Sequence, residues 1–511
     1  MAGGVHPLVE ILIQVCVELG VVDFVISPGS RSAPLTAAAG QHPLAVKTHV
    51  VYDERAAAYF ALGLAQQKQR PVGVICTSGT AAVNFGPAVV EAYYQGIPLL
   101  VLTADRPPEW IDQQDNQAIH QSGLFSAHVR GAYALPAETG FADAEWYVAR
   151  ITAEAIAIAQ GLAPGPVHIN VPLREPLYSP PALTPDFTHP VRISRTHPAS
   201  LQLDAENWAD LAATWNQAER KLIIAGMHAA DPHLRAAITA LAADPAVAVF
   251  SDITANLHGI PGVTSQADLA LASTDAATLD ALRPDLVVHF GGQVTSKSVK
   301  QLLRRHRPPQ LWHIRPSLPA PDTYQALTDV IQMHPWPFLQ RLAESAVPNP
   351  HCDYAQKWQT ITHTAATALE TLLDEAPFGE FHAVRQVLCT LPADSYLQIG
   401  NSMPIRYANF AGLRPAHLPA QVNSNRGASG IDGAVSTAVG AAVATGAFTT
   451  LIVGDLGFFY DRNGLWQRSL PPDLHIVLLE QSWRRHFRPH RRPGSPGPTA
   501  PRTIFPDTPD P

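Results

Sequence analysis

The first 175 residues alternate short apolar runs with longer segments in which apolar residues recur at helical spacing. The short runs are rich in Val and Ile and almost continuously hydrophobic, which is typical of strands in a parallel sheet covered on both faces. The segments 55–67 and 80–96 carry Ala-rich apolar stripes and are predicted helices. This alternation indicates βαβ units. The predicted strands are 21–27, 46–52, 71–78, 98–104 and 166–172.

The same alternation recurs twice more, after proline-containing stretches at 176–190 and near 345–352. Proline removes a backbone donor and disfavours helix at the preceding residue, so 176–190 is predicted to be an extended linker. We therefore predict an α/β protein of three tandem doubly wound parallel-sheet domains, at 1–180, 190–345 and 353–482. The later predicted strands are 221–227, 247–253, 285–292, 310–316, 395–401, 449–457 and 473–480, with helices that include 231–243, 353–375 and 380–391.

Residues 483–511 break this pattern, because they are rich in proline and arginine and have almost no aliphatic periodicity. Such a composition cannot bury enough apolar surface to offset the entropy of ordering the chain. We expect an aberrant, disordered tail and a third domain that is truncated or frameshifted.

Composition limits which kinds of partner the protein is expected to bind and in which cellular compartment it is expected to lie. Hydrophobic residues make up 46% of the chain, and the net charge of −8 leaves no basic excess for nucleic acid. The four cysteines form no CxxC pair, which favours a reducing compartment, and we expect the cytoplasm. The first apolar stretch, 6–20, lacks a basic leader and is too short to span a bilayer, so we expect neither a signal peptide nor membrane insertion.

Polar residues follow several predicted strands of the first set. Ser30 and Arg31 follow the first strand, Ser78 and Gly79 follow the third, and Arg106 follows the fourth. The carboxyl ends of parallel strands face one crevice, and arginine binds carboxylates in a bidentate way. Each turn taken alone is compatible with ordinary turn chemistry. Together they predict a site for a small carboxylate.

Two further candidates in this region are ambiguous when taken alone. Glu54 lies where the second strand meets its helix, and a carboxylate there also favours a helix N-terminus by about 0.3–1 kcal/mol. Gln117, in the polar loop DNQAIHQ, offers an amide to a polar substrate but is equally compatible with solvated surface.

The third set carries a second group of candidates. Ser402 and Arg406 follow the strand at 395–401, and Arg426 precedes three glycines that open an Ala-rich helix. Gly-rich turns at a helix N-terminus let backbone N–H groups approach a phosphate. Gly454 and Asp455 follow a buried strand, and a carboxylate there suits Mg²⁺, although Gly-Asp pairs are also common in turns.

Taken in order, the segments ISPGSRSAPL, DERAAAYFALG, TSGTAAVNF, TADRPPE, DNQAIHQ, GNSMPIR, NSNRGASGIDG and GDLGFFYDRNGL resemble the thiamine-diphosphate-dependent family, in its menaquinone-pathway branch. The resemblance implies a pyrimidine-binding domain at 1–180, a central domain at 190–345 and a diphosphate-binding domain at 353–482. It implies thiamine diphosphate and Mg²⁺ or Mn²⁺ as cofactors. It also implies a homodimer or homotetramer with the cofactor between the first domain of one subunit and the third of another.

The resemblance further implies an enzyme that decarboxylates 2-oxoglutarate and adds the succinyl unit to isochorismate. Glu54 matches the catalytic glutamate that hydrogen-bonds the aminopyrimidine ring of the cofactor. Two anionic substrates require several cations, which this chain supplies. The residues implied to bind isochorismate are Ser30, Arg31, Arg106, Gln117 and Lys297, and those implied to bind 2-oxoglutarate are Ser402, Arg406 and Arg426. The residues implied to bind the cofactor are Glu54, Ser78, Gly79, Gly454 and Asp455. The implied metal ligands are Asp455 and Gln481.

Two positions depart from the family pattern. Ser298 stands where some relatives carry a second basic residue, and WRRHF at 483–487 stands where the family has GGGIF. If the reading frame is moved by one base, the Trp codon and arginine codons of the form CGN become compatible with the sequence GGGIF. We therefore hypothesise that the residues from about Glu480 onward are frameshifted, which leaves Gln481 where the family has asparagine. The alternatives are an inactive remnant or another thiamine-diphosphate-dependent enzyme, such as an acetolactate synthase or a 2-oxoacid decarboxylase.

Overall fold

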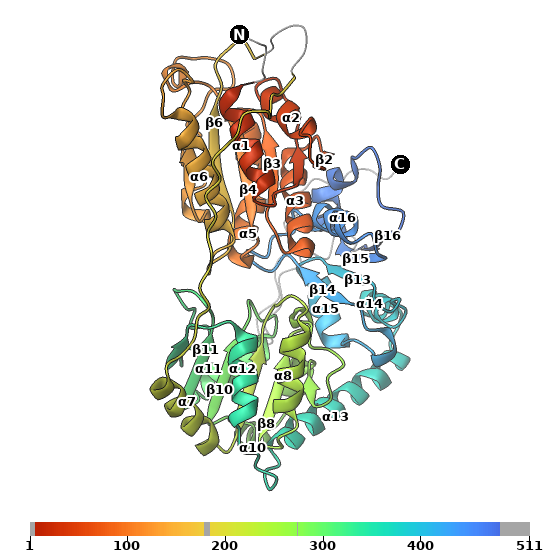
Figure 1. The fold of residues 1–511 in the computed structure, drawn as a ribbon. Helices are drawn as coiled ribbons and strands as arrows, with labels where there is room; N and C mark the ends of the chain where they lie inside the picture. Colours follow the sequence, from red (N-terminus) through yellow and green to blue (C-terminus); the bar gives the residue numbers. More distant parts are fainter. Residues whose placement is uncertain (1–5, 178–183, 273, 481–511) are drawn as a thin grey trace, which may run out of the picture. The chain divides into compact units, whose positions relative to one another are not determined.

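The computed structural model describes residues 6–177, 184–272 and 274–480, and these form three sheets flanked by helices (Figure 1). Every strand pair described in the three sheets is parallel. The predicted α/β class with three successive parallel sheets is confirmed. The predicted tail 483–511 and Gln481 lie outside the described residues.

The first sheet has six strands in the order β2-β1-β3-β4-β6-β5. Its strands are β1 (Asp23–Ile26), β2 (Lys47–Val50), β3 (Val72–Cys76), β4 (Leu99–Asp105), β5 (Ala132–Ala134) and β6 (Val167–Pro172). Its helices are α1 (Pro7–Glu18), α2 (Ala33–Gly40), α3 (Glu54–Lys68), α4 (Thr80–Asn84), α5 (Gly86–Gln95) and α6 (Ala144–Ala159). The single helix predicted over 80–96 is instead two, because Pro87 lacks an N–H and starts a new helix. The sequence pattern missed β5, which is only three residues long.

Alternate strand residues face opposite sides of this sheet, as the pleat requires. On β3, Ile75 joins the core formed with α1, α2 and α6, whereas Val72, Val74 and Cys76 join the core formed with α3 and α5. Both faces are therefore apolar, which explains the nearly continuous hydrophobic runs of the sequence.

The second sheet also has six strands, in the order β12-β11-β10-β7-β8-β9. Its strands are β7 (Lys221–Ala225), β8 (Val247–Ser251), β9 (Val263–Thr264), β10 (Leu286–Phe290), β11 (Gln310–Ile314) and β12 (Asp329–Ile331). Its helices are α7 (Ala205–Gln217), α8 (Pro232–Ala242), α9 (Ala267–Ala272), α10 (Ala276–Ala281), α11 (Lys297–Arg305), α12 (Pro335–Ser345) and α13 (Tyr354–Glu375). Tyr354 and Trp358, at the start of α13, pack in the core of this sheet.

The third sheet has four described strands, in the order β14-β13-β15-β16. They are β13 (Tyr396–Ile399), β14 (Gln421–Ser424), β15 (Thr449–Gly454) and β16 (Leu474–Leu479). Its helices are α14 (Glu380–Leu388), α15 (Met403–Ala411), α16 (Ala434–Thr445) and α17 (Asp455–Asp461). The sequence pattern missed β14, because Gln421, Asn423 and Ser424 interrupt its hydrophobicity.

Helices α3 and α16 join the first and third sheets in one continuous core (Figure 1). Their backbones approach closely where two glycines face the opposite helix. A Cβ atom on Gly63 would lie 2.1 Å from the carbonyl oxygen of Thr437, and one on Gly440 would lie 2.1 Å from that of Phe60. Only glycine permits this approach.

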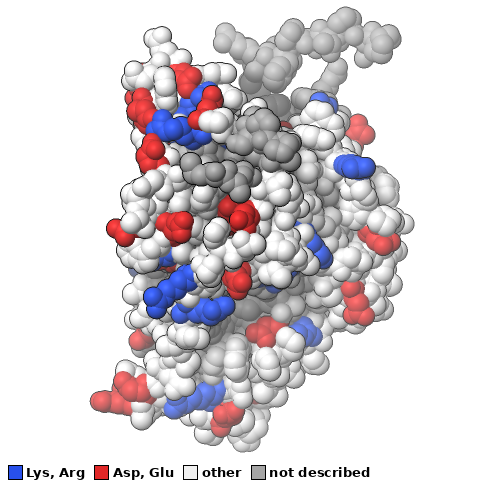
Figure 2. All heavy atoms as spheres, turned by 45° about the horizontal axis from the view of Figure 1, so that its top comes forward, with Lys and Arg blue, Asp and Glu red and all other residues white. Residues whose placement is uncertain are grey.

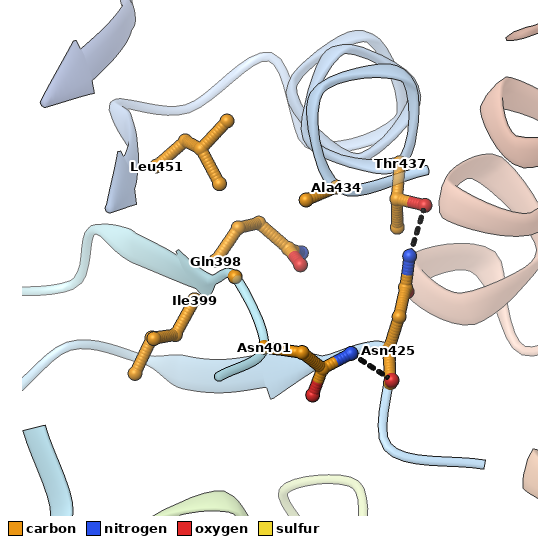
Figure 3. A pocket seen from close by; sticks show the side chains of 8 residues that line it. Gln398, Ile399, Asn401, Asn425, Ala434, Thr437 and Leu451 are labelled. Atoms are coloured by element: carbon orange, nitrogen blue, oxygen red, sulfur yellow. Dashed lines mark hydrogen bonds between the residues drawn. The ribbon is translucent and has the colours of Figure 1, made fainter. Parts of the chain in front are cut away.

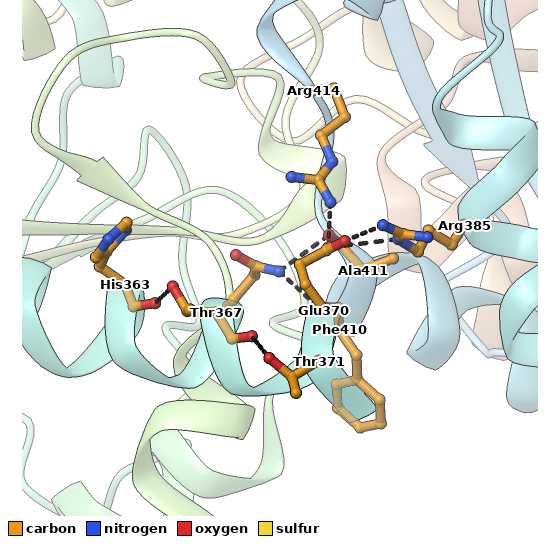
Figure 4. A network of polar contacts seen from close by, with 9 residues as sticks. His363, Thr367, Glu370, Thr371, Arg385, Phe410, Ala411 and Arg414 are labelled. Carbon is orange, nitrogen blue, oxygen red and sulfur yellow. Dashed lines mark hydrogen bonds and ion pairs between the residues drawn. The ribbon is translucent and has the colours of Figure 1, made fainter. Parts of the chain in front are cut away.

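A polar cluster links α13 to the third sheet (Figure 4). The Glu370 carboxylate pairs with Arg385 of α14 and with Arg414, which follows α15. In the same place, Gln266 donates through Nε2 to the carbonyl oxygens of Phe410, at 2.7 Å, and Ala411, at 2.9 Å. Gln266 thereby connects the second sheet to the end of α15, and Glu370 connects α13 to α14 and to the loop after α15.

The exposed charges on the face drawn in Figure 2 are mixed, with Lys and Arg lying among Asp and Glu and no broad area of one sign. Within the three described ranges, no helix combines the length and the apolarity needed to cross a membrane.

Candidate functional site

The first sheet brings Arg31 and Arg106 together at the carboxyl ends of its strands. Arg31 is only 5% exposed; its Nη1 donates to the carbonyl oxygen of Leu173 at 2.7 Å, and its Nη2 lies 2.8 Å from Glu175 Oε1. Nη1 of Arg106 lies 3.8 Å from the same oxygen and 2.7 Å from Asp115 Oδ2. The Glu175 side chain is 68% exposed, so two guanidinium groups converge on one carboxylate that faces solvent. This geometry suits a ligand carboxylate.

A buried polar network supports these strand ends. Gln121 accepts a hydrogen bond from the backbone N–H of Gly79 at 2.6 Å and donates to Asn170 Oδ1 at 3.0 Å. Asn170 in turn donates to Asp105 Oδ2 at 2.7 Å. Burial raises the pKa of Asp105. Gln121 escaped the sequence analysis because it lies in an irregular loop, where no periodicity marks a buried side chain.

The remaining predicted residues of this region surround the network. Gly79 has φ +80°, and a Cβ atom there would lie 3.1 Å from the carbonyl oxygen of Gln117, so the two backbones are in contact. Ser78 is buried, whereas the side chains of Ser30 and Gln117 are exposed. The structure thus places Gln117 beside Gly79 at the end of β3.

Glu54 is the first residue of α3 and is half-buried. Asp53 caps this helix by accepting from the Ala56 N–H at 2.9 Å. Burial, and secondarily the carboxylate of Glu54, raises the pKa of the Cys76 thiol at the end of β3. Glu54 therefore lies near the end of β3, on the side of the sheet that faces the third sheet.

The segment that follows Asp455 contacts both neighbours of Glu54. Asn463, in the 3₁₀ helix η5 (Arg462–Leu465), donates to Asp53 Oδ2 at 3.0 Å. Arg55 donates to the carbonyl oxygen of Tyr460 at 2.5 Å. Within one chain, the start of α3 and the segment after Asp455 are therefore held together.

The third sheet gathers a second set of cations. Nη1 of Arg426 donates to Asn401 Oδ1 at 3.4 Å, and Asn401 Nδ2 donates to the carbonyl oxygens of Asn425, at 2.5 Å, and Gly430, at 2.6 Å. Burial lowers the pKa of the Arg426 guanidinium; Asp252 opposes this shift, and the charge of nearby Arg406 adds to it. Positive charge partly removed from water favours binding of an anion.

Ser402, between Asn401 and α15, is exposed and has φ +72°. A residue other than glycine in this region stores on the order of 1–3 kcal/mol of strain, and such residues cluster at ligand sites. Ser402 and Arg406 therefore both lie at the carboxyl end of β13, as the sequence predicts.

The loop before α11 lies against the Arg426 loop. Ser429 donates through Oγ to Gln293 Oε1 at 3.1 Å, and the pKa of Lys300 is lowered by burial and by the charge of Arg426. Lys297, the first residue of α11, is exposed and has no ion-pair partner among the described residues. The sequence analysis grouped Lys297 with Arg31 and Arg106, whereas the structure joins its loop to that of Arg426.

A small pocket lies at the carboxyl ends of the third sheet, beneath the start of α16 (Figure 3). Asn425 donates to Thr437 Oγ1 at 3.0 Å across it, and the Gln398 side chain points into it. Gln398 Nε2 and Asn425 Oδ1 are buried without a hydrogen-bond partner. The other lining residues are Ile399, Gly400, Asn401, Ala434 and Leu451.

Asp455 starts α17 directly after Gly454 and is 8% exposed, with Oδ1 accepting from the Leu456 N–H at 2.6 Å. No group of three His, Cys, Asp or Glu side chains able to hold a metal ion occurs in residues 6–177, 184–272 and 274–480. The predicted second ligand, Gln481, lies outside these ranges.

Comparison with known proteins identifies the family. Residues 7–124 match the family described as thiamine pyrophosphate enzyme, N-terminal TPP binding domain, and residues 193–399 match the middle domain of thiamine pyrophosphate enzymes. The 2-succinyl-5-enolpyruvyl-6-hydroxy-3-cyclohexene-1-carboxylate synthase of Cytophaga hutchinsonii is 40% identical over 485 residues, which cover 95% of this chain and 84% of that protein. The synthases of Desulfotalea psychrophila and Flavobacterium johnsoniae are 39% and 37% identical, over 94% of this chain and 87% and 84% of those proteins.

The chain belongs to this synthase family of thiamine-diphosphate-dependent enzymes. The resemblance seen in the sequence and the prediction of an enzyme that forms carbon–carbon bonds are thereby confirmed, and the alternatives are not favoured. The frameshift stays a hypothesis about residues outside the described ranges, which sequencing the gene across codons 470–511 would test.

The residues of this synthase chain fit the family's cofactor. Gln398 Nε2 and Asn425 Oδ1 are buried and unpartnered at the carboxyl ends of the third sheet, and Ser424 Oγ and Asn423 Nδ2 are likewise unpartnered on β14. Buried polar atoms without partners are costly and mark places where a polar ligand or water binds. A single carboxylate at Asp455 also fits Mg²⁺, which is usually bound through one or two carboxylates, waters and phosphate oxygens.

Proposed function

We propose that this chain is a 2-succinyl-5-enolpyruvyl-6-hydroxy-3-cyclohexene-1-carboxylate synthase that decarboxylates 2-oxoglutarate and adds the succinyl unit to isochorismate. The observation that carries this proposal is the presence of two separate pairs of arginines, each with at least one guanidinium that is partly or fully buried. Arg31 and Arg106 lie at the end of the first sheet, and Arg406 and Arg426 at the end of the third. Two substrates that each carry carboxylates require two such sets.

Each set has its own role in the proposal. Arg31 and Arg106, with Ser30 and Gln117, would bind isochorismate; the family resemblance adds Lys297 to this set, although its loop lies beside that of Arg426. Arg426, held by Asn401, would bind a carboxylate of 2-oxoglutarate together with Ser402 and Arg406. These assignments follow from the family resemblance and are supported by the convergence of Arg31 and Arg106 on Glu175 and by the electrostatic influence of Arg406 on nearby Arg426.

In this proposal, the residues that bind the cofactor lie between the isochorismate set and the 2-oxoglutarate set. Glu54 would accept a hydrogen bond from the aminopyrimidine ring, beside Ser78 and Gly79 at the end of β3. Asp455, next to Gly454, would bind Mg²⁺ or Mn²⁺ at the diphosphate. When bound, thiamine diphosphate supplies the carbon nucleophile and the electron sink for decarboxylation of an oxoacid. The chain contributes the carboxylate that polarises the ring and the cations that orient both substrates.

A substrate comparison tests this function. We expect consumption of 2-oxoglutarate that requires isochorismate, thiamine diphosphate and Mg²⁺ together, measured by CO₂ release and by mass of the product. Pyruvate in place of 2-oxoglutarate should give no turnover. Turnover of pyruvate would favour another oxoacid enzyme, and cofactor binding without any turnover would favour an inactive remnant.

We further propose a cytoplasmic homodimer or homotetramer, in which the cofactor lies between the first domain (1–180) of one subunit and the third domain (353–482) of another. The prediction is that Glu54→Gln and Asp455→Asn chains, each inactive alone, regain activity when co-expressed. A statistical mixture of two-fold dimers should recover about a quarter of wild-type activity, since one site in each mixed dimer keeps both native residues.

The same co-expression experiment distinguishes a site shared between two subunits from a site formed within one chain. If both carboxylates of one site came from the same chain, every site would retain one substitution and the mixture would stay inactive. Light scattering after size exclusion reports whether the mixed species is a dimer or a tetramer.

A further inference from the structure

Glu91 is a buried carboxylate on α5 with a complete set of donors. It is 1% exposed and accepts from the backbone N–H groups of Gly427 at 2.6 Å, Ala428 at 2.7 Å and Ser429 at 3.2 Å. Nε2 of Gln95, one helical turn further along, donates to the same carboxylate at 2.5 Å. Successive backbone N–H groups that converge in this way form a nest for an anion. In this protein the Glu91 side chain, on helix α5 of the first sheet, occupies the nest formed by residues 427–429.

The loop is shaped around this carboxylate. A Cβ atom on Gly427 would lie 2.7 Å from the carbonyl oxygen of Glu91 and 2.9 Å from its Oε1, so a larger residue at 427 would push the loop away. Ser429 has φ +65°, in the left-handed region that residues other than glycine rarely adopt, and its N–H donates to the Glu91 carboxylate. The loop conformation and the Glu91 side chain therefore depend on each other.

The held loop directly follows Arg426 and ends at the carbonyl oxygen that fixes Asn401. Gly430 accepts from Asn401 Nδ2 at 2.6 Å, and Asn401 Oδ1 is the hydrogen-bond partner of Arg426 at 3.4 Å. Displacing residues 427–430 would thus move both the backbone that carries Arg426 and the side chain that orients its guanidinium. Burial raises the pKa of the Glu91 carboxyl, and the four hydrogen bonds to it oppose that shift. Burial lowers the pKa of the Arg426 guanidinium, and Asp252 and, less, Glu91 oppose that shift.

We propose that Glu91 is a positioning residue for the oxoacid site: by filling the 427–429 nest, it sets the place of Arg426 for the carboxylate of 2-oxoglutarate. This inference rests on the proposed function for the identity of the ligand. A carboxylate is required because only an anion accepts from three N–H groups and an amide at once. An amide in its place would present an NH₂ group to at least one N–H donor.

The test compares Glu91→Gln with the wild-type chain in two measurements. In hydrogen–deuterium exchange, peptides covering 425–430 should exchange faster in the variant, at least about tenfold at the amides of the nest. In steady-state kinetics, KM for 2-oxoglutarate should rise about tenfold, whereas KM for isochorismate should stay within about twofold.

Asp244→Asn is the matched control. Asp244 is also a buried carboxylate that accepts from two backbone N–H groups, those of Ala246 and Asn349, both at 3.0 Å, but it lies in the turn that leads from α8 to β8 of the second sheet. This control should lower the thermal midpoint without changing KM for 2-oxoglutarate. Gln95→Leu removes one of the four donors to Glu91. It should change hydrogen exchange and KM for 2-oxoglutarate in the same direction as Glu91→Gln but by less. This variant replaces Glu91→Gln in the test if Glu91→Gln does not fold.

Unchanged exchange at 427–429 would overturn the proposal, and so would faster exchange with an unchanged KM for 2-oxoglutarate. Equal changes in both KM values would overturn it as well, since they would indicate a general structural effect. A wild-type chain that does not consume 2-oxoglutarate would instead refute the proposed function, and the exchange measurement would still decide whether Glu91 holds the loop.

Discussion

Glu54→Gln is expected to lower turnover of 2-oxoglutarate at least about 100-fold and to leave the fold intact. Glu54 is half-buried at the start of α3, beside the end of β3, where burial and, to a lesser extent, the charge of Glu54 raise the pKa of Cys76. Glutamine keeps the shape of the side chain but cannot take up or share a proton as a carboxylate does. CO₂ release under saturating substrates and cofactor measures the effect, and far-ultraviolet circular dichroism monitors the fold.

Glu145→Gln separates this role from a simple effect on a helix terminus. Glu145 is an exposed acidic residue in the first turn of α6, just as Glu54 is in the first turn of α3, but α6 packs on the opposite face of the sheet. If Glu54 acted only on the positive end of its helix, both variants would lose about 0.3–1 kcal/mol of stability and neither would lose turnover. Turnover of Glu54→Gln within threefold of wild type would reject its predicted role.

Gly440→Ala should destabilise the protein by about 3 kcal/mol. The added Cβ atom would lie 2.1 Å from the carbonyl oxygen of Phe60, a backbone atom of α3 that cannot rotate away. Helices α3 and α16 would have to separate, and the core shared by the first and third sheets would open. The midpoint of thermal unfolding, followed by circular dichroism, should fall by several degrees, and activity should fall with it because Glu54 starts α3.

Gly40→Ala is the control for this substitution. Gly40 is the last residue of α2, and nothing lies within 4 Å of a Cβ atom built on it. Since alanine favours helix over glycine by up to about 1 kcal/mol, this variant should be as stable as wild type or slightly more so. Equal midpoints for Gly440→Ala and wild type would show that the two helices do not pack as tightly as described.

Hydrophobic patterning predicted the main elements of the fold well, since strands such as β3 and β4 are buried on both faces and are therefore continuous apolar runs. It failed where polar or very short strands complete a sheet, as with β14 and β5. The order of strands and their pairing depend on contacts between distant segments, which local patterns do not encode.

The residues of the candidate site were likewise predicted only in part from the sequence. Arg31 and Arg106 were found in the sequence because they lie shortly after predicted strands, Arg426 because it precedes three glycines that open a helix, and Asp455 because it belongs to a Gly-Asp pair next to a buried apolar run. Glu91 was missed, although a charged residue within the apolar stripe of AVVEAYYQ was a signal that it needed buried donors. Three of its four donors are backbone N–H groups more than 330 residues away, and no local pattern reveals those.

The sequence by itself determined the fold class, the family motifs and the residue types available for chemistry, because these follow from local periodicity and from short segments next to strand ends. Only the tertiary structure decided that Arg31 and Arg106 share Glu175, and that the loop of Lys297 lies beside that of Arg426. The physical reason is that hydrogen bonds and ion pairs act over a few ångströms in space. Which groups come within that range is decided by how α3 and α16 pack the sheets together.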